Sequence, residues 1–148
     1  MEPLTDWDAA YDNLAAVPGS AEISARWAVE AATYHAQHPP EVHTYGAGAR
    51  QSYHLFRPEE LPRGLAVFVH GGYWRRFDPS WFSHLAAGAV GRGWAVALPG
   101  YTLCPEASIT QISREVSAAI AHGAGLVPGP LRLAGHSAGG HLVTRAIC

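Results

Sequence analysis

Three short, mainly apolar runs constrain the fold of this chain more than any other feature of its sequence. They cover residues 65–69, 94–98 and 131–134. Runs of this kind are typical of strands that are buried on both faces of a parallel sheet. Apolar residues at helical spacing separate them, at about 79–91 and 108–124. Strand and helix in alternation predict βαβ units and therefore an open, mostly parallel sheet with helices on both faces.

Two further strands are expected upstream of these units, at 41–45 and 51–56. The glycine-rich turn at 46–50 would join them as an antiparallel hairpin, with glycine available for positive φ. Because apolar and polar residues alternate in both segments, we expect half-exposed strands at the N-terminal edge of the sheet.

Helical segments precede the hairpin. Residues 21–37 predict an amphipathic helix, with Ser20 as its N-cap and Pro39-Pro40 as its end. A shorter helical turn is expected at 6–13, packed back on the body. Residues 1–40 thus form a cap-like segment ahead of one α/β domain at 41–148. A helix there either covers a cleft or simply packs on the sheet, and the sequence leaves both open.

The third apolar run leads into Gly135-x-Ser137-x-Gly139, and a helix-forming segment follows it. A serine at a sharp strand-to-helix turn projects its oxygen above the sheet edge, and glycines two residues either side relieve crowding. The helix N-terminus also directs free N–H groups toward that point. This order is typical of a nucleophile elbow, although a plain glycine-rich turn would have the same letters.

A second motif ends the first apolar run, with the residues His70-Gly71-Gly72-Tyr73-Trp74. Ligands of open α/β sheets bind at the carboxyl ends of the strands, so this loop and Ser137 are expected on one rim. A glycine pair lets backbone amides turn toward a carbonyl oxygen that becomes negative during acyl transfer. The alternative is a glycine-rich turn without a ligand.

Composition excludes several other classes of function. The 148 residues carry a formal charge of −2, which does not favour nucleic acid or an anionic membrane as partner. No apolar stretch is long enough for a membrane span, and the acidic N-terminus is unlike a signal peptide. The nine histidines and two cysteines fit no metal-ligand spacing, so neither metal nor cofactor is expected. Free cysteines favour a cytoplasmic location.

These motifs resemble the hormone-sensitive-lipase-like branch of the α/β-hydrolases. The resemblance rests on His-Gly-Gly-Tyr-Trp at 70–74, Tyr-Thr-Leu-Cys-Pro-Glu at 101–106 and Gly-His-Ser-Ala-Gly-Gly at 135–140. Within that branch the motifs are most similar to those of kynurenine formamidases (arylformamidases), enzymes of tryptophan catabolism. The resemblance implies the N-terminal part of an α/β-hydrolase fold whose C-terminal part is missing.

The resemblance also implies roles for individual residues. Ser137 would be the nucleophile, and the amides of Gly72, Tyr73 and Ala138 would form the oxyanion hole, with Gly71 as a further donor. Tyr73 and Trp74 would border the substrate pocket, where His136 is a weaker candidate. His70 would be structural, and neither His136, which flanks the serine, nor His141, one helical turn later, is expected to be the base.

The chain departs from the triad order of the fold, in which an acid and then a histidine follow the serine. No carboxylate follows Glu115. We therefore expect this chain alone to be inactive or poorly active, with acid and base beyond Cys148. The leading function is arylformamide hydrolysis through a formyl-enzyme on Ser137. A general carboxylesterase acting on small acyl esters, or a non-catalytic remnant or binding protein, remains open, as does a homo-oligomer.

Overall fold

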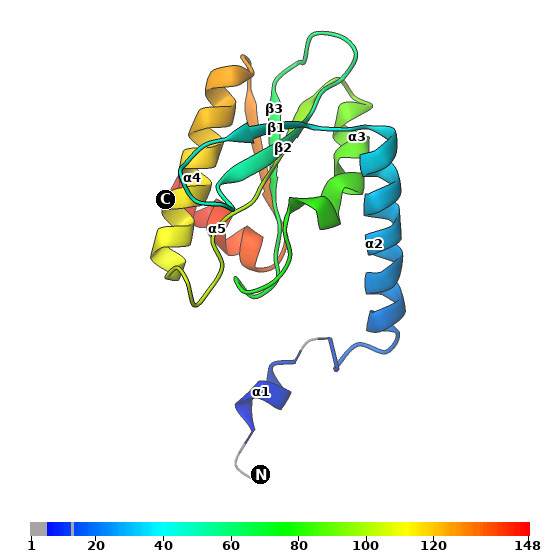
Figure 1. Ribbon diagram of the computed structural model, residues 1–148, viewed down its shortest axis with the longest axis vertical. Coiled ribbons are helices and arrows are strands. Elements are labelled where there is room, and N and C mark those ends of the chain that lie inside the picture. Colours follow the sequence, from blue (N-terminus) through cyan, green and yellow to red (C-terminus); the bar gives the residue numbers. More distant parts are fainter. Residues whose placement is uncertain (1–5, 13) are drawn as a thin grey trace.

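The computed structural model describes residues 6–12 and 14–148. A short helix, α1 (Trp7–Ala10), lies apart from the body, and the long helix α2 (Ser20–Gln37) runs along one side of the molecule (Figure 1). The predicted turn at 6–13 is therefore a helix, although Asn13 lies outside the described residues. Trp7 and Tyr11 are each 60% exposed, so α1 contributes little to the core, and the expectation that it packs back on the body was wrong (Figure 1).

Five strands form one mixed sheet in the order β1-β2-β4-β3-β5. The strands are β1 (Glu41–Thr44), β2 (Ser52–Phe56), β3 (Leu65–Val69), β4 (Ala95–Pro99) and β5 (Leu131–Gly135). β3 lies between β4 and β5 and is parallel to both, whereas β1, β2 and β4 pair antiparallel. The open sheet with parallel βαβ strands and an N-terminal antiparallel hairpin is thus confirmed, and the sheet as a whole is mixed.

Side chains of β3 alternate between two hydrophobic clusters, one on each face of the sheet. Leu65, Val67 and Val69 join a cluster with Ile112 of helix α4 (Ile109–Leu126) and Leu142 of helix α5 (Ala138–Ile147). The opposite face carries Phe68, which packs with Phe82 and other residues of the helical segment that follows β3, at 79–90. The two clusters confirm helices on both faces, with α4 and α2 on opposite sides of the molecule (Figure 1).

Local sequence explains how the helices begin. In α4 (Ile109–Leu126), the Ser108 hydroxyl accepts from the Gln111 amide while the Gln111 side chain accepts from the Ser108 amide. This reciprocal capping box satisfies two backbone donors that a helix start leaves free. The final helix, α5 (Ala138–Ile147), begins directly after Ser137.

The segment expected as one helix at 79–91 forms two elements. Most of it is a 3₁₀ helix, η1 (Pro79–Ala86), and only α3 (Ala87–Val90) is α-helical. Asp78 caps η1 by accepting from the Ser80 amide, and the Ser83 hydroxyl donates to the Ser80 carbonyl, three residues earlier. These local hydrogen bonds favour the tighter turn.

Three finer expectations were wrong. Gly19, at φ 75°, is the N-cap of α2, and the Ser20 hydroxyl instead donates to the Leu14 carbonyl at 2.7 Å. β2 is an inner strand, because it pairs with β4 as well as β1 and buries Tyr53. The hairpin turn at 46–50 needs no positive φ, since Gly46 and Gly48 are not among the residues that adopt one.

Candidate functional site

Ser137 sits at a sharp turn between β5 and α5. Its backbone adopts φ 53° and ψ −120°, a conformation that residues with a side chain rarely occupy. Strain of this kind costs on the order of 1–3 kcal/mol and persists where surrounding contacts hold it. The Gly139 amide donates to the His136 carbonyl at 2.8 Å, which closes the turn around the serine. Ser137 remains exposed to solvent.

The two glycines of the motif are required by close backbone approach. A Cβ on Gly135 would lie 2.4 Å from the Gly139 carbonyl oxygen. A Cβ on Gly139 would lie 2.0 Å from the Val69 carbonyl oxygen, at the end of β3. Both distances are far below van der Waals contact. The start of α5 therefore packs directly on the neighbouring parallel strand, with no room for a side chain.

The loop after β3 has an unusual backbone. Gly72 has φ 112°, and three residues with side chains also have positive φ: Tyr73 at 57°, Trp74 at 57° and Phe77 at 74°. The amides of Arg75 and Arg76 both donate to the Gly72 carbonyl at 2.9 Å, which folds the loop back on itself. Such a compact, twisted loop is suited to pointing several amides in one direction.

The structure brings this loop and the serine turn together. A Cβ on Gly71 would lie 3.0 Å from the Ser137 Cβ and 2.7 Å from the His136 carbonyl oxygen. The His136 amide also donates to the Val69 carbonyl at 3.1 Å. Two motifs more than sixty residues apart in sequence thus meet at one rim of the sheet, as expected from the parallel strand order.

His70 is held as a neutral, buried ring. It is 2% exposed and lies parallel to Tyr101 and Phe82, with ring centroids 4.4 and 5.6 Å away. Its Nδ1 lies 2.7 Å from the Gly71 carbonyl oxygen, and the Tyr101 hydroxyl donates to the His70 carbonyl at 2.8 Å. Burial lowers the pKa of His70 from 6.5 to about 4, outweighing the hydrogen bond to Gly71. These contacts suit a ring that supports the loop.

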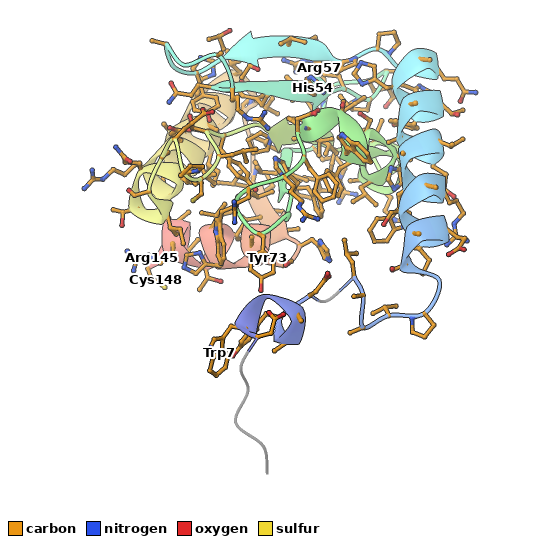
Figure 2. All side chains as sticks on the ribbon, turned by 60° about the horizontal axis from the view of Figure 1, so that its bottom comes forward. Trp7, His54, Arg57, Tyr73, Arg145 and Cys148 are labelled. Carbon is orange, nitrogen blue, oxygen red and sulfur yellow. The ribbon has the colours of Figure 1, made fainter. Side chains whose placement is uncertain are left out.

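The expected pocket residues point in different directions. Tyr73 is 49% exposed and extends toward α1, where its hydroxyl donates to the Tyr11 carbonyl at 3.4 Å (Figure 2). Trp74 packs on the core and meets the ring of His141 edge-on at 5.5 Å. Its buried Nε1 has no hydrogen-bond partner among the described residues. His136 is exposed beside Ser137.

Sequence reasoning missed the residues that hold the loop in place. The Cys104 amide donates to the Trp74 carbonyl at 2.8 Å. Arg50, in the hairpin turn, donates from Nη2 to the Phe77 carbonyl and from Nε to the Tyr101 carbonyl at 3.0 Å. Nothing in the local sequence of a glycine-rich turn signals such a long-range contact.

The surroundings of Ser137 offer few groups for acid–base chemistry. The chain has no Asp or Glu after Glu115, whose carboxylate accepts from the Thr102 amide at 2.8 Å.

Within the described ranges, no three His, Cys, Asp or Glu side chains gather in a way that could hold a metal ion. None of the helices in that part of the chain has the length and hydropathy needed to cross a bilayer. A groove of about 420 Å³ lies elsewhere, between α2 and η1.

Comparison with known proteins gives two kinds of relative. Kynurenine formamidase from Drosophila melanogaster is 35% identical over 109 residues, which cover 70% of this chain and 36% of that protein. A crystal structure from Silicibacter sp. TM1040, described as a candidate thioesterase, has a TM-score of 0.87 and 49% identity. That match covers 93% of this chain and 54% of the other.

Esterase B from Lactobacillus rhamnosis, crystallised with an inhibitor, is also similar, with a TM-score of 0.59 and 25% identity over 82% of this chain and 46% of the esterase. No protein-family model matches the sequence. The chain spans about a third of the length of the curated relatives that it matches. Its open five-stranded sheet and its sequence together make this chain a relative of the kynurenine formamidases, built on the α/β-hydrolase fold.

Proposed function

We propose that this protein is a serine-dependent acyl hydrolase that acts on arylformamides of the N-formylkynurenine type. One observation carries the proposal: Ser137, in its strained turn, lies in contact with Gly71 of the twisted loop after β3. On this proposal, the nucleophile and the loop whose amides would bind the oxyanion are close neighbours. The likeness to kynurenine formamidases supports the arylformamide as substrate.

In the proposed reaction, the Ser137 hydroxyl attacks the formyl carbon, and its proton passes to a general base. The amides of Gly72, Tyr73 and Ala138, with Gly71 as a further donor, stabilise the negative oxygen of the tetrahedral intermediate. The C–N bond then breaks, the base returns the proton to the leaving arylamine, and a formyl ester remains on Ser137. Water attacks this ester and releases formate, which regenerates the serine.

The general base and the acid that orients it are not assigned within these residues. His141 is the one histidine after Ser137, and its ring lies against Trp74. We therefore propose that the 148-residue chain by itself turns over substrate slowly. Its residual rate would be that of a site with amide donors and a nucleophile but without a base.

Ester and thioester hydrolysis is the second candidate function. It is supported by the likeness to esterase B and, at 49% identity, to the candidate thioesterase. The same serine and amide donors serve all three substrates, because each reaction passes through a tetrahedral oxyanion. A non-catalytic binding protein would need neither the strained serine nor the loop packed against it.

We also propose that residues 6–40 border the approach to the site, since the Tyr73 hydroxyl of the loop donates to the carbonyl of Tyr11, the residue directly after α1. The substrate is a small molecule on this proposal.

The free thiols of Cys104 and Cys148 support a reducing, cytoplasmic location.

The test compares kcat/KM for N-formylkynurenine, a p-nitrophenyl ester and a short acyl thioester. The measurements use both the protein purified from its own cell and the recombinant 148-residue chain. Ser137→Ala should abolish turnover of the preferred substrate, whereas Ser117→Ala, on the exposed surface of α4, should leave it unchanged. Turnover that survives Ser137→Ala would refute the serine mechanism. A preference for either ester over the formamide would select the second candidate.

A further inference from the structure

The loop 70–77 holds three residues with side chains at positive φ, and something outside the loop must keep them there. The two backbone hydrogen bonds within the loop, from the amides of Arg75 and Arg76, both end on the Gly72 carbonyl. They do not involve the carbonyls of Trp74 and Phe77, which are two of the three residues with positive φ. Each of these two carbonyls accepts a donor from a distant segment of the chain.

The Trp74 carbonyl is bound by the Cys104 amide, and the Phe77 carbonyl by the Arg50 guanidinium. Arg50 is also bound to the segment that carries Cys104, because its Nε donates to the Tyr101 carbonyl. The Arg50 side chain thus links the C-terminal end of the loop, at Phe77, to the segment that binds the loop at Trp74. The same Tyr101 supports the start of the loop through its hydroxyl and the His70 carbonyl.

The hairpin that presents Arg50 is itself packed against that segment. The Gly100 amide donates to the Ser52 carbonyl at 2.8 Å, and the Tyr45 hydroxyl donates to the Gly100 carbonyl at 2.7 Å. A Cβ on Gly100 would lie only 2.8 Å from the Arg50 carbonyl oxygen. The backbone of the turn is therefore fixed where the guanidinium needs it.

The chemistry of the contact favours arginine over lysine. Two carbonyls are reached by two different nitrogens of one planar group, Nε and Nη2. An ammonium group is a single donor centre on a flexible stem and does not reproduce this fork. Arg50 forms no ion pair with a carboxylate in the described part of the chain, so its donors are free for backbone carbonyls.

We propose that Arg50 is a positioning residue for the loop that would bind the oxyanion: it holds Phe77 and Tyr101 in register so that the amides at 71–73 face Ser137. The proposal rests on the proposed function, since it assigns Arg50 a role in that reaction. It does not require Arg50 to touch the substrate.

Hydrogen exchange tests the physical part of this proposal without any assay of activity. In Arg50→Lys, the amides of Arg75 and Arg76 should exchange about tenfold faster than in the wild type, because the loop opens more often. Peptides from α4 should exchange at the wild-type rate. The matched control is Arg57→Lys, at the far end of the molecule from Tyr73 (Figure 2), where Arg57 pairs with Glu41. Unchanged loop exchange, or an equal increase in α4, would overturn the proposal.

Turnover of the preferred substrate by the protein from its own gene tests the functional part. Arg50→Lys should lower kcat about tenfold with little change in KM, because the loop's amides act mainly on the transition state. Arg57→Lys should match the wild type. A faster-exchanging loop with wild-type kcat would overturn the positioning role. A wild-type protein without Ser137-dependent turnover would instead refute the proposed function. The exchange data would then show only that Arg50 stabilises the loop, with no role in catalysis.

Discussion

The buried ring of His70 makes the stability of the fold depend on pH. The folded state holds its pKa at about 4, because the ring is enclosed between Tyr101 and Phe82, whereas the unfolded chain restores the ordinary value of 6.5. Between these values the unfolded state binds more protons than the folded state. Stability from His70 is therefore complete above pH 6.5 and is lost as the pH falls toward 4.

The two pKa values determine the size of the effect. Linkage gives a loss of about 2 kcal/mol in the free energy of unfolding between pH 7 and pH 5 from this one residue. Burial also lowers the pKa values of His54 and His84, so their contributions have the same sign as that of His70. A comparison with His70→Asn, whose amide retains a donor for the Gly71 carbonyl, separates their contribution from that of His70.

The assay is urea unfolding of both proteins at pH 7 and pH 5, followed by tryptophan fluorescence. The wild type should lose about 2 kcal/mol more than His70→Asn over this interval, because only the wild type carries the extra titrating group. If both proteins lose the same free energy, the ring is not held neutral by its burial. A wild type that gains stability at pH 5 would show that the imidazolium is favoured in the fold.

Three further predictions concern the backbone and the helix ends. Gly139→Ala should destabilise by about 3 kcal/mol, since the new Cβ meets the Val69 carbonyl at 2.0 Å; a melting temperature equal to that of the wild type would contradict this packing. Gly125→Ala is the matched control, because nothing lies within 4 Å of its added Cβ in α4, and it should stabilise by roughly 0.5–1 kcal/mol. A loss of stability would show that the site is not open. Ser108→Ala should cost about 1 kcal/mol by removing the capping box with Gln111, and unchanged urea unfolding would show that the cap is not needed.

The parts of the fold that depend on local pattern were predictable from the sequence. The apolar run at 65–69 is β3 residue for residue, and the runs at 94–98 and 131–134 lie within one residue of β4 and β5. The glycines of the serine turn were also expected, because a sharp turn against a neighbouring strand leaves no room for Cβ atoms. That two motifs at the ends of parallel strands share a rim followed from the strand order alone.

The features that the sequence did not predict depend on contacts between distant segments. β2 reads as an edge strand from its alternation, and its inner position follows from pairing such as that of Leu55 with Ala97. Gly19 and Ser20 are both good N-cap residues, and the turn before α2 decides between them by requiring positive φ. Arg50 carries no local signal, since its two acceptors are carbonyls that any residue could supply.

The central position of β3 has a consequence for how the chain folds. Its partner β5 pairs Leu131 with Leu65, and β4 pairs Ala95 with the same residue, so the middle strand depends on two distant partners. Closing such long loops is slow, because chain entropy is lost before the contacts form. We therefore expect the serine turn to be assembled in a late folding step, after β5 has found its register. Until then β3 exposes an unpaired apolar edge, and the yield of refolded protein should fall as its concentration rises.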